Sequence, residues 1–332
     1  MSFWKNGGKV VAGLLSAVVL SAAMPAVAQE KYPTKPIRMI NPYPPGGAVD
    51  IAARIVIEPM RQTLGQPIVL ESKPGGFGMI AGQEMIRAPA DGYTLVFGQV
   101  NTHAIWPVLH RKKFPFDFRK ETIAVASIAD VPSFVAAAVK DFPFKTLKEA
   151  LDYGRKNPGS LRYSSAGIGS FPHFDMEMLA RRAGVDMRHI PGKGGATIVH
   201  DLANGDAQMG VVNVASAAAM VRSGTIRGLA VIADKRLEDF PDVPTLAELG
   251  FPNVGTHHWL GIFARTGTPD HVLATVHKAA AEALKRPETI EALKKQAMRP
   301  FASESPQAAR KWLGDELELW QKIVDEVKIN VD

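Results

Sequence analysis

Two glycine-rich segments combine residue types that can hold an anion through the backbone. They are Asn41–Ala48 and Tyr163–Ser170, and each follows an apolar run and precedes a stretch with helical spacing. Glycine has no Cβ, so neighbouring N–H groups can turn toward one point, and a helix that begins there adds free N–H groups and a partial positive charge. Each segment could therefore bind a phosphate or a carboxylate.

Turn chemistry alone is the competing explanation, because glycine is common between a strand and a helix. Two further segments of similar composition, 98–103 and 192–195, are also expected to be loops. Finding several such segments at predicted strand ends gives a binding role and a turn role about equal weight.

The histidine and acidic residues near these segments fit both roles. His173 lies about one turn inside a predicted helix, where it could donate to a carboxylate or act as a structural residue. Asp50 and Arg54 are four residues apart and most simply pair on one helix face. His257 and His258 point to opposite faces of a predicted strand, so they cannot chelate one metal, and we predict no metal site.

The sequence carries none of the common catalytic motifs. It has no G-x-x-x-x-G-K-[ST], no G-x-S-x-G and no H-E-x-x-H, and the absence of cysteine excludes thiol catalysis, disulfides and cysteine-bound metals. We therefore predict no catalytic residue and no cofactor. An exported α/β enzyme that acts on a small anionic substrate remains the alternative.

Short apolar runs alternate with amphipathic stretches, which predicts an α/β fold. The expected strands are 37–43, 68–71, 93–97, 123–128, 134–139, 161–164, 187–190, 208–212, 226–233 and 259–264. The expected helices are 48–64, 79–88, 146–156, 171–183, 197–203, 215–223, 269–285 and 305–327. Gly65 and Gly184 are placed to end two of these helices, and Thr146 can cap a third. In open α/β sheets the ligand lies at the carboxyl ends of the strands, where both anion-binding candidates fall.

The amino-terminal segment has the composition of an export signal. Lys5 and Lys9 precede an apolar run over 10–23 that is short for a membrane span, and Ala26-Val27-Ala28 is a cleavage pattern. An uncleaved anchor is the alternative. The chain has 332 residues, enough for about two domains, and its net charge of +6 comes without the basic, aromatic-interleaved run that binds nucleic acid.

The ordered set of short motifs resembles the tripartite tricarboxylate transporter substrate-binding proteins, or Bug (TctC) receptors. The resemblance spans the mature chain and rests on the segments 40–54, 73–76, 90–95, 164–173, 189–194, 242–250, 259–261 and 266–269. The resemblance implies a two-lobed periplasmic-binding-protein fold (Venus-flytrap, type II) with two mixed sheets flanked by helices.

The resemblance also implies a ligand and a place for it. A di- or tricarboxylate or an aromatic acid would be held largely by backbone amides, Gly169 among them, and delivered to the membrane permease subunits of the transporter. The implied ligand-binding residues are Tyr43, Pro45, Gly46, Gly47, Ala48, Asn101, Thr102, His103, Ser164, Ser165, Gly167, Gly169, Ser170 and His173. Pro191-Gly192-Lys193 and Gly210–Asn213 depart from the family pattern, which leaves the size of the ligand open.

We expect a signal peptide over 1–28, one lobe over 29–129 plus 255–332, and a second lobe over 130–254. The hinge would lie near Asp130 and Thr256. The protein would be periplasmic and monomeric.

Cleavage after Ala28 should give a mature chain that begins at Gln29, because small residues occupy both positions that a signal peptidase reads. Mass spectrometry of the exported protein measures this directly. An intact chain or a different first residue would contradict the prediction.

Overall fold

The computed structural model describes residues 31–110 and 116–329, and residues from Tyr32 onward form one compact unit. The predicted signal peptide and its cleavage site lie outside the described residues. Within the described ranges, none of the helices combines the length and the apolar character needed to cross a membrane.

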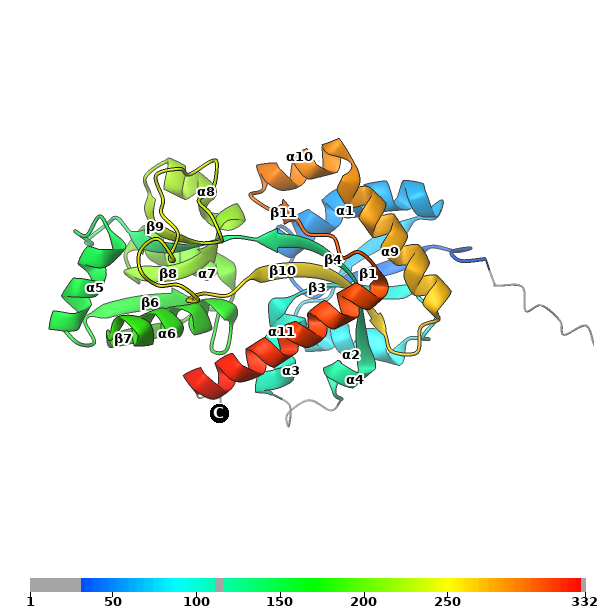
Figure 1. Cartoon of the computed structure of the whole chain (residues 1–332), viewed down its shortest axis with the longest axis horizontal. Helices are drawn as coiled ribbons and strands as arrows, with labels where there is room; N and C mark the ends of the chain where they lie inside the picture. The colour runs from blue at the N-terminus through cyan, green and yellow to red at the C-terminus, as the bar shows by residue number, and fades with distance from the viewer. Residues whose placement is uncertain (1–30, 111–115, 330–332) are drawn as a thin grey trace, which may run out of the picture. The chain divides into compact units, whose positions relative to one another are not determined.

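The first of two mixed sheets has the strand order β11-β4-β10-β3-β1-β2. Its strands are β1 (Ile37–Asn41), β2 (Ile68–Ser72), β3 (Thr94–Gln99), β4 (Thr122–Val131), β10 (His258–Arg265) and β11 (Arg299–Pro300). β1 pairs in parallel with β2 and β3, whereas β10 runs antiparallel to β3 and β4. Helices α1 (Ala48–Leu64) and α9 (Asp270–Lys285) pack against each other on this sheet (Figure 1). Their apolar faces join the strands in one buried cluster.

The second sheet has the order β7-β6-β8-β5-β9. Its strands are β5 (Ser133–Ala138), β6 (Leu161–Ser165), β7 (Met187–Pro191), β8 (Met209–Asn213) and β9 (Ile226–Ile232). The helices around it are α5 (Leu147–Lys156), α6 (Phe171–Ala183), α7 (Gly195–Asn204) and α8 (Val214–Arg222). β6 is parallel to both β7 and β8, and β5 is antiparallel to β8 and β9.

The two sheets place the two anion-binding candidates at equivalent positions. β1 lies between two parallel neighbours in the first sheet, and β6 lies between two parallel neighbours in the second. The loop after β1 leads into α1, and the loop after β6 leads into α6. Each loop therefore leaves the carboxyl end of an inner parallel strand, where ligands bind in α/β sheets.

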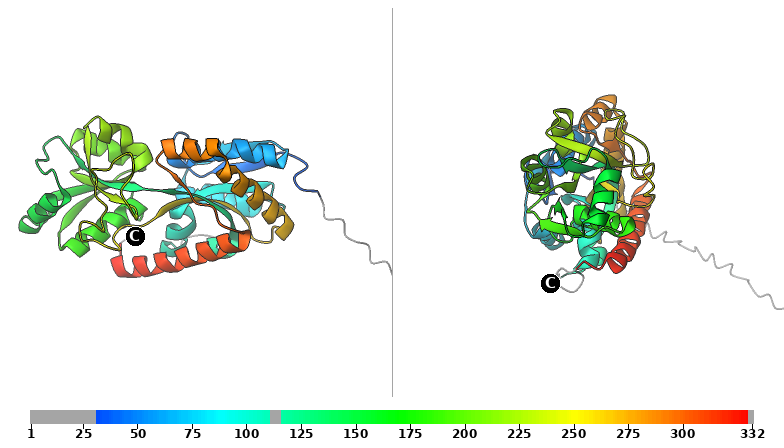
Figure 2. Two further views of the ribbon diagram at one scale, coloured as in Figure 1. Left: turned by 45° about the horizontal axis from the view of Figure 1, so that its top comes forward. Right: turned by 90° about the vertical axis from the view of Figure 1, so that its left-hand side faces the viewer.

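The long helix α11 (Pro306–Val327) touches both halves of the unit. It packs on β4 of the first sheet and also on α6, where Trp320 meets Phe174 edge to face at 5.4 Å (Figures 1 and 2). The Arg181 guanidinium donates to the carbonyl oxygens of Glu326 and Val327 at the end of α11. A side chain of α6 thus satisfies carbonyls that the helix itself leaves free.

Local sequence signals account for several helix boundaries. Gly65 and Gly184 end α1 and α6 in the left-handed conformation, as predicted. Thr146 accepts from the Glu149 N–H in a capping box at the start of α5. Pro59 does not end α1, which continues to Leu64.

The prediction of a loop over 98–103 is wrong. β3 extends to Gln99, and Asn101–Ile105 form a π-helical turn (η2) that continues into α3 (Trp106–Leu109). Residues 101–105 are all buried, so core packing and not local glycine content determines their conformation. Sequence analysis also missed η1 (Gly76–Gly78), α4 (Phe118–Glu121), α10 (Pro287–Lys295) and β11. The other helix is α2 (Met79–Arg87), close to its predicted bounds.

Asp175 is a buried carboxyl beside the chain segment that returns from the second sheet to the first. The side chain is 1% exposed, and its Oδ1 accepts from Thr256 Oγ1 at 2.9 Å. Burial raises the pKa of Asp175 from 3.8 to about 8, because the charged form loses its hydration. The carboxyl is therefore mainly protonated in the folded protein at neutral pH.

The free energy of unfolding should fall as pH rises between about 4 and about 8. In that window the unfolded chain has already released the Asp175 proton, while the folded chain still holds it, so rising pH favours unfolding. Asp175→Asn keeps the oxygen that Thr256 contacts and should flatten this dependence. Urea unfolding across the window measures it, with the exposed Asp186→Asn as control. Equal slopes for all three proteins would contradict the prediction.

Candidate functional site

The loop after β1 offers backbone N–H groups at an uncapped helix start. Gly47 is the N-cap of α1 and makes no side-chain capping hydrogen bond. The Gly46 N–H donates to Asp50 Oδ2 at 3.0 Å, and Arg54 Nε donates to the same oxygen at 2.9 Å. The predicted pairing of Asp50 with Arg54 is thus confirmed, and these bonds lower the Asp50 pKa against the opposing effect of burial, so its carboxylate fixes the loop.

The amides that follow Gly46 stay available. Within the described residues, the N–H groups of Gly47, Ala48 and Val49 have no protein acceptor. Pro45, Gly46 and Gly47 are exposed and Ala48 is half-buried. The first turn of a helix points such N–H groups outward along the axis, where they attract negative charge.

Tyr43 ties this loop to the helical turn after β3. Its hydroxyl lies 2.7 Å from Thr102 Oγ1, and its N–H donates to Asn41 Oδ1 at 3.0 Å. Burial raises the Tyr43 pKa to about 12, so the hydroxyl keeps its proton and remains a hydrogen-bond donor.

Asn101 connects the same turn to the second loop. Its Oδ1 accepts from the Phe171 N–H at 3.0 Å, and Phe171 is the first residue of α6. Asn101 is 6% exposed and Phe171 is 5% exposed. Hydrogen bonds thus join the segments 43–48, 101–102 and 164–171, which sequence analysis had selected separately.

The loop after β6 differs from its prediction, because its amides are largely occupied. The Gly167 N–H donates to Ser165 Oγ at 3.1 Å, and the Gly169 N–H donates to His173 Nδ1 at 3.1 Å. The Ser170 N–H and hydroxyl both donate to the Gly167 carbonyl. In the structure, the Gly169 N–H therefore donates to a neighbouring side chain, His173, contrary to the expectation that it points at a ligand.

Positive backbone angles make this loop depend on glycine. Gly167 has φ 126° and Gly169 has φ 75°, which side chains rarely tolerate. Ser164 faces away from the loop, since its hydroxyl donates to Asp201 Oδ2 at 2.5 Å.

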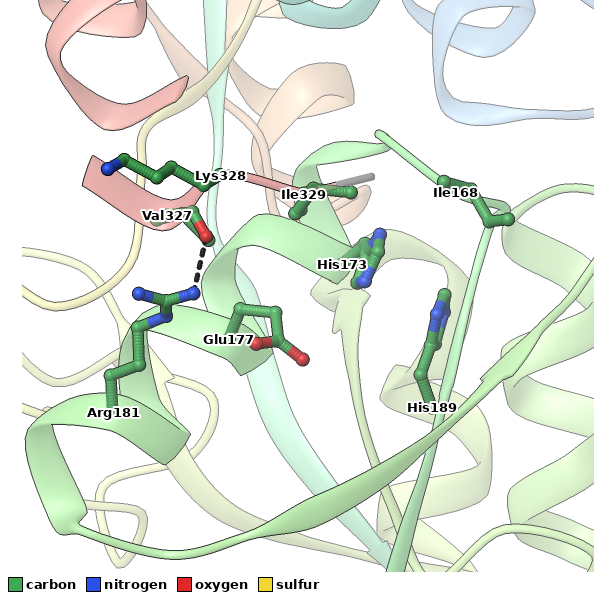
Figure 3. A pocket seen from close by; sticks show the side chains of 8 residues that line it. All are labelled: Ile168, His173, Glu177, Arg181, His189, Val327, Lys328 and Ile329. Carbon is green, nitrogen blue, oxygen red and sulfur yellow. Dashed lines mark hydrogen bonds between the residues drawn. The ribbon is translucent and has the colours of Figure 1, made fainter. Parts of the chain in front are cut away.

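Two histidines lie beneath the loop. His173 stacks on His189 with ring centroids 3.8 Å apart, and His189 Nε2 lies 2.7 Å from Ser165 Oγ. Both rings line a hollow of about 290 Å³ beside Ile168, Glu177 and the end of α11 (Figure 3). His189 lies in the motif 189–194 but is not among the predicted site residues; its place on β7, next to β6, was the available signal.

His103 is separated from the other selected residues. It is 3% exposed and stacks on Phe263 with ring centroids 3.6 Å apart, so its ring belongs to the core. Burial lowers the His103 pKa to about 3 and keeps the ring neutral. Asn101 and Thr102 instead contact the two loops.

His257 and His258 face different partners, as their alternation predicts. His257 Nδ1 lies 3.6 Å from Asp130 Oδ1, whereas His258 is buried against Phe171 and lies 2.9 Å from Asn213 Oδ1. Burial lowers the His258 pKa to about 3, so this ring stays neutral next to the first residue of α6.

One surface cluster in the described residues brings metal-ligating atoms together. His200, Asp201 and Asp206 place one atom each within 4.8 Å of one another. Asp201 already accepts from Ser164, and the His200 ring lies within hydrogen-bond distance of Asn204. We interpret the cluster as ordinary surface polar contacts.

Comparisons with known proteins agree with this architecture. The model of the "Tripartite tricarboxylate transporter family receptor" matches residues 52–329. A solved structure described as a periplasmic transporter is 36% identical, covers 91% of this chain and 100% of its own, and superposes with a TM-score of 0.83.

Two similar structures contain ligands. Rpa4515 of R. palustris with adipate is 28% identical, with a TM-score of 0.82 and coverage of 90% of this chain and 99% of its own. MatC from Rhodopseudomonas palustris with bound malate is also 28% identical, with a TM-score of 0.78 and coverage of 88% and 100%.

The fold and the matched family define a periplasmic solute-binding receptor, not an enzyme. The chain belongs to the tripartite tricarboxylate transporter receptor family. The predicted fold class and the predicted family are thereby confirmed, and the alternative of an exported enzyme is set aside.

Removing the acceptor at Asn101 should destabilise the protein. Asn101→Ala leaves the buried Phe171 N–H without a partner, which costs about 1–3 kcal/mol of unfolding free energy. Asn204→Ala, which loses only an exposed contact with His200, is the control and should cost less. Urea denaturation of both variants gives the comparison, and an unchanged Asn101→Ala midpoint would show that this bond contributes nothing.

Proposed function

We propose that this receptor captures a small dicarboxylate between the loop after β1 and the loop after β6 and delivers it to the permease of its transporter. The observation that carries the proposal is the uncapped start of α1, joined by Tyr43 and Thr102 to the turn that contacts the second loop. The contact residues proposed are Tyr43, Pro45, Gly46, Gly47, Ala48, Val49, Asn101, Thr102, Ser165, Ala166, Gly167, Ile168 and Ser170.

Free amides favour an anion at α1. Three consecutive N–H groups without a protein acceptor match the two oxygens of one carboxylate, and the helix start adds a favourable field. The nearby cation, Arg54, is already paired with Asp50. Recognition would therefore depend on backbone donors and not on a side-chain charge.

The second loop would supply a wall and a second group of donors. Among the described residues, the N–H groups of Ala166 and Ile168 have no protein acceptor, and they flank the occupied Gly167 amide. A ligand with two carboxylates could place one at each loop. The adipate and malate of the similar structures are dicarboxylates, which supports this class over a monocarboxylate.

The proposed lobes are 29–129 plus 255–332, built on the first sheet, and 130–254, built on the second. Closing them around the carboxylate would exclude water and strengthen each hydrogen bond. We infer that the monomeric receptor is exported, loses its signal peptide after Ala28 and presents its closed form to the permease.

Calorimetry should detect binding of adipate or malate and much weaker binding of adipamide, which has the same length but no charge. A carboxylate at a hundredfold excess over its Kd should stabilise the fold by about 2.7 kcal/mol, without turnover. Citrate and benzoate test the tricarboxylate and aromatic classes. Equal affinity for adipate and adipamide would contradict the anion argument.

Ala48→Pro should weaken dicarboxylate binding roughly tenfold or more, because it deletes one charge-assisted N–H donor. Proline fits the first helical position, and Gly47 before it is already extended at φ −80° and ψ 171°. Ala48→Gly keeps the N–H and is the matched control. If both variants bind alike while both remain folded, the start of α1 does not hold the ligand.

A further inference from the structure

We propose that His173 is a positioning residue: its Nδ1 holds the Gly169 N–H and thereby sets the shape of the ligand loop, without touching the ligand. This inference rests on the proposed function and assigns a role that sequence analysis left open between ligand contact and structural residue. Three observations support it: the hydrogen bond from Gly169 to His173, the stacking of His173 on His189, and the hollow that both rings line.

The hydrogen bond determines the tautomer of His173. Nδ1 accepts from the Gly169 N–H at 3.1 Å, so the ring proton must lie on Nε2. Gly169 has φ 75° and precedes the N-cap of α6. An N–H in this unusual backbone conformation would otherwise be buried without an acceptor, and His173, 6% exposed, supplies one from the first turn of the same helix.

His189 holds the His173 ring in place. The two rings stack at 3.8 Å with an interplanar angle of 19°, and Figure 3 shows them side by side at the wall of the hollow. His189 Nε2 also lies 2.7 Å from Ser165 Oγ, at the other end of the loop. The pair therefore contacts both ends of the segment 165–169.

Neutral rings make this arrangement possible. Burial lowers the pKa of His173 to about 3 and that of His189 to about 4. Near neutral pH the stack then carries no repulsion and Nδ1 keeps its lone pair. Glu177 and Arg181 line the same hollow, but Glu177 accepts from the Tyr163 hydroxyl and Arg181 donates to carbonyls of α11.

Two substitutions separate positioning from ligand contact. The amide oxygen of asparagine falls near the Nδ1 position of histidine, whereas the amide of glutamine reaches the Nε2 position. His173→Gln should weaken dicarboxylate binding roughly tenfold because the Gly169 acceptor is lost, and His173→Asn should restore most of the affinity. Surface His200→Gln is the control for loss of a histidine elsewhere on the second sheet's helices.

Nuclear magnetic resonance tests the bond in the unaltered protein. We expect the Gly169 amide to exchange slowly with solvent, the His173 ring to carry its proton on Nε2, and the Gly169 amide to exchange faster in His173→Gln. A proton on Nδ1 would overturn the proposal whether or not any variant folds.

The binding data have equally definite outcomes. Loss in His173→Gln with recovery in His173→Asn supports positioning. The reverse order would show that Nε2 contacts the ligand. If both variants bind as tightly as the natural protein, His173 has no part in binding. Either result overturns the proposal. If the natural protein binds no carboxylate, the proposed function fails, while the tautomer and the Gly169 exchange rate still decide the hydrogen bond.

Discussion

Hydrogen-bond satisfaction at the starts of two helices is the constraint on which this structure depends. The first N–H groups of a helix have no acceptor within the helix. At α6 the protein supplies an acceptor, because Asn101 Oδ1 accepts from the Phe171 N–H, and Pro172 has no N–H that needs one. At α1 the N–H groups after Gly46 are left without one. This difference is the reason why we propose the α1 loop as the place for an incoming anion and the α6 loop as a more rigid wall beside it.

The two sheets place these two helix starts at equivalent positions. Both put the relevant loop after an inner strand with parallel neighbours, and both receive their antiparallel strand, β10 or β5, from the chain that crosses between them. The crossing is stabilised by polar groups kept neutral through burial, namely Asp175 on Thr256 and His258 beside Asn213. Such groups fix geometry by hydrogen bonding without adding charge near a proposed anion site.

Sequence patterns predicted what depends on local chemistry. The strands before Asn41–Ala48 and Tyr163–Ser170, the glycine ends of α1 and α6, and the Thr146 cap all follow from residue type and spacing. The patterns did not show that Gly98–His103 packs as strand and helix, because that depends on burial of His103 against Phe263. Spacing also could not show that the Gly169 N–H donates to His173 Nδ1. A separation of four residues predicts that the two residues lie close together, but not which atom is the acceptor.

The way α11 is fastened at both ends has a mechanical consequence. The helix has 22 residues, so at 1.5 Å per residue it is a rigid rod of roughly 33 Å. One part lies on β4, and its last carbonyls are held by Arg181 of α6. A rotation of about 5° around one end of a rod of this length moves the other end by roughly 3 Å, which is more than a hydrogen bond can stretch. In the proposed closure of the lobes, the attachment of α11 to Arg181 would therefore limit how far the sheets can rotate before these hydrogen bonds break.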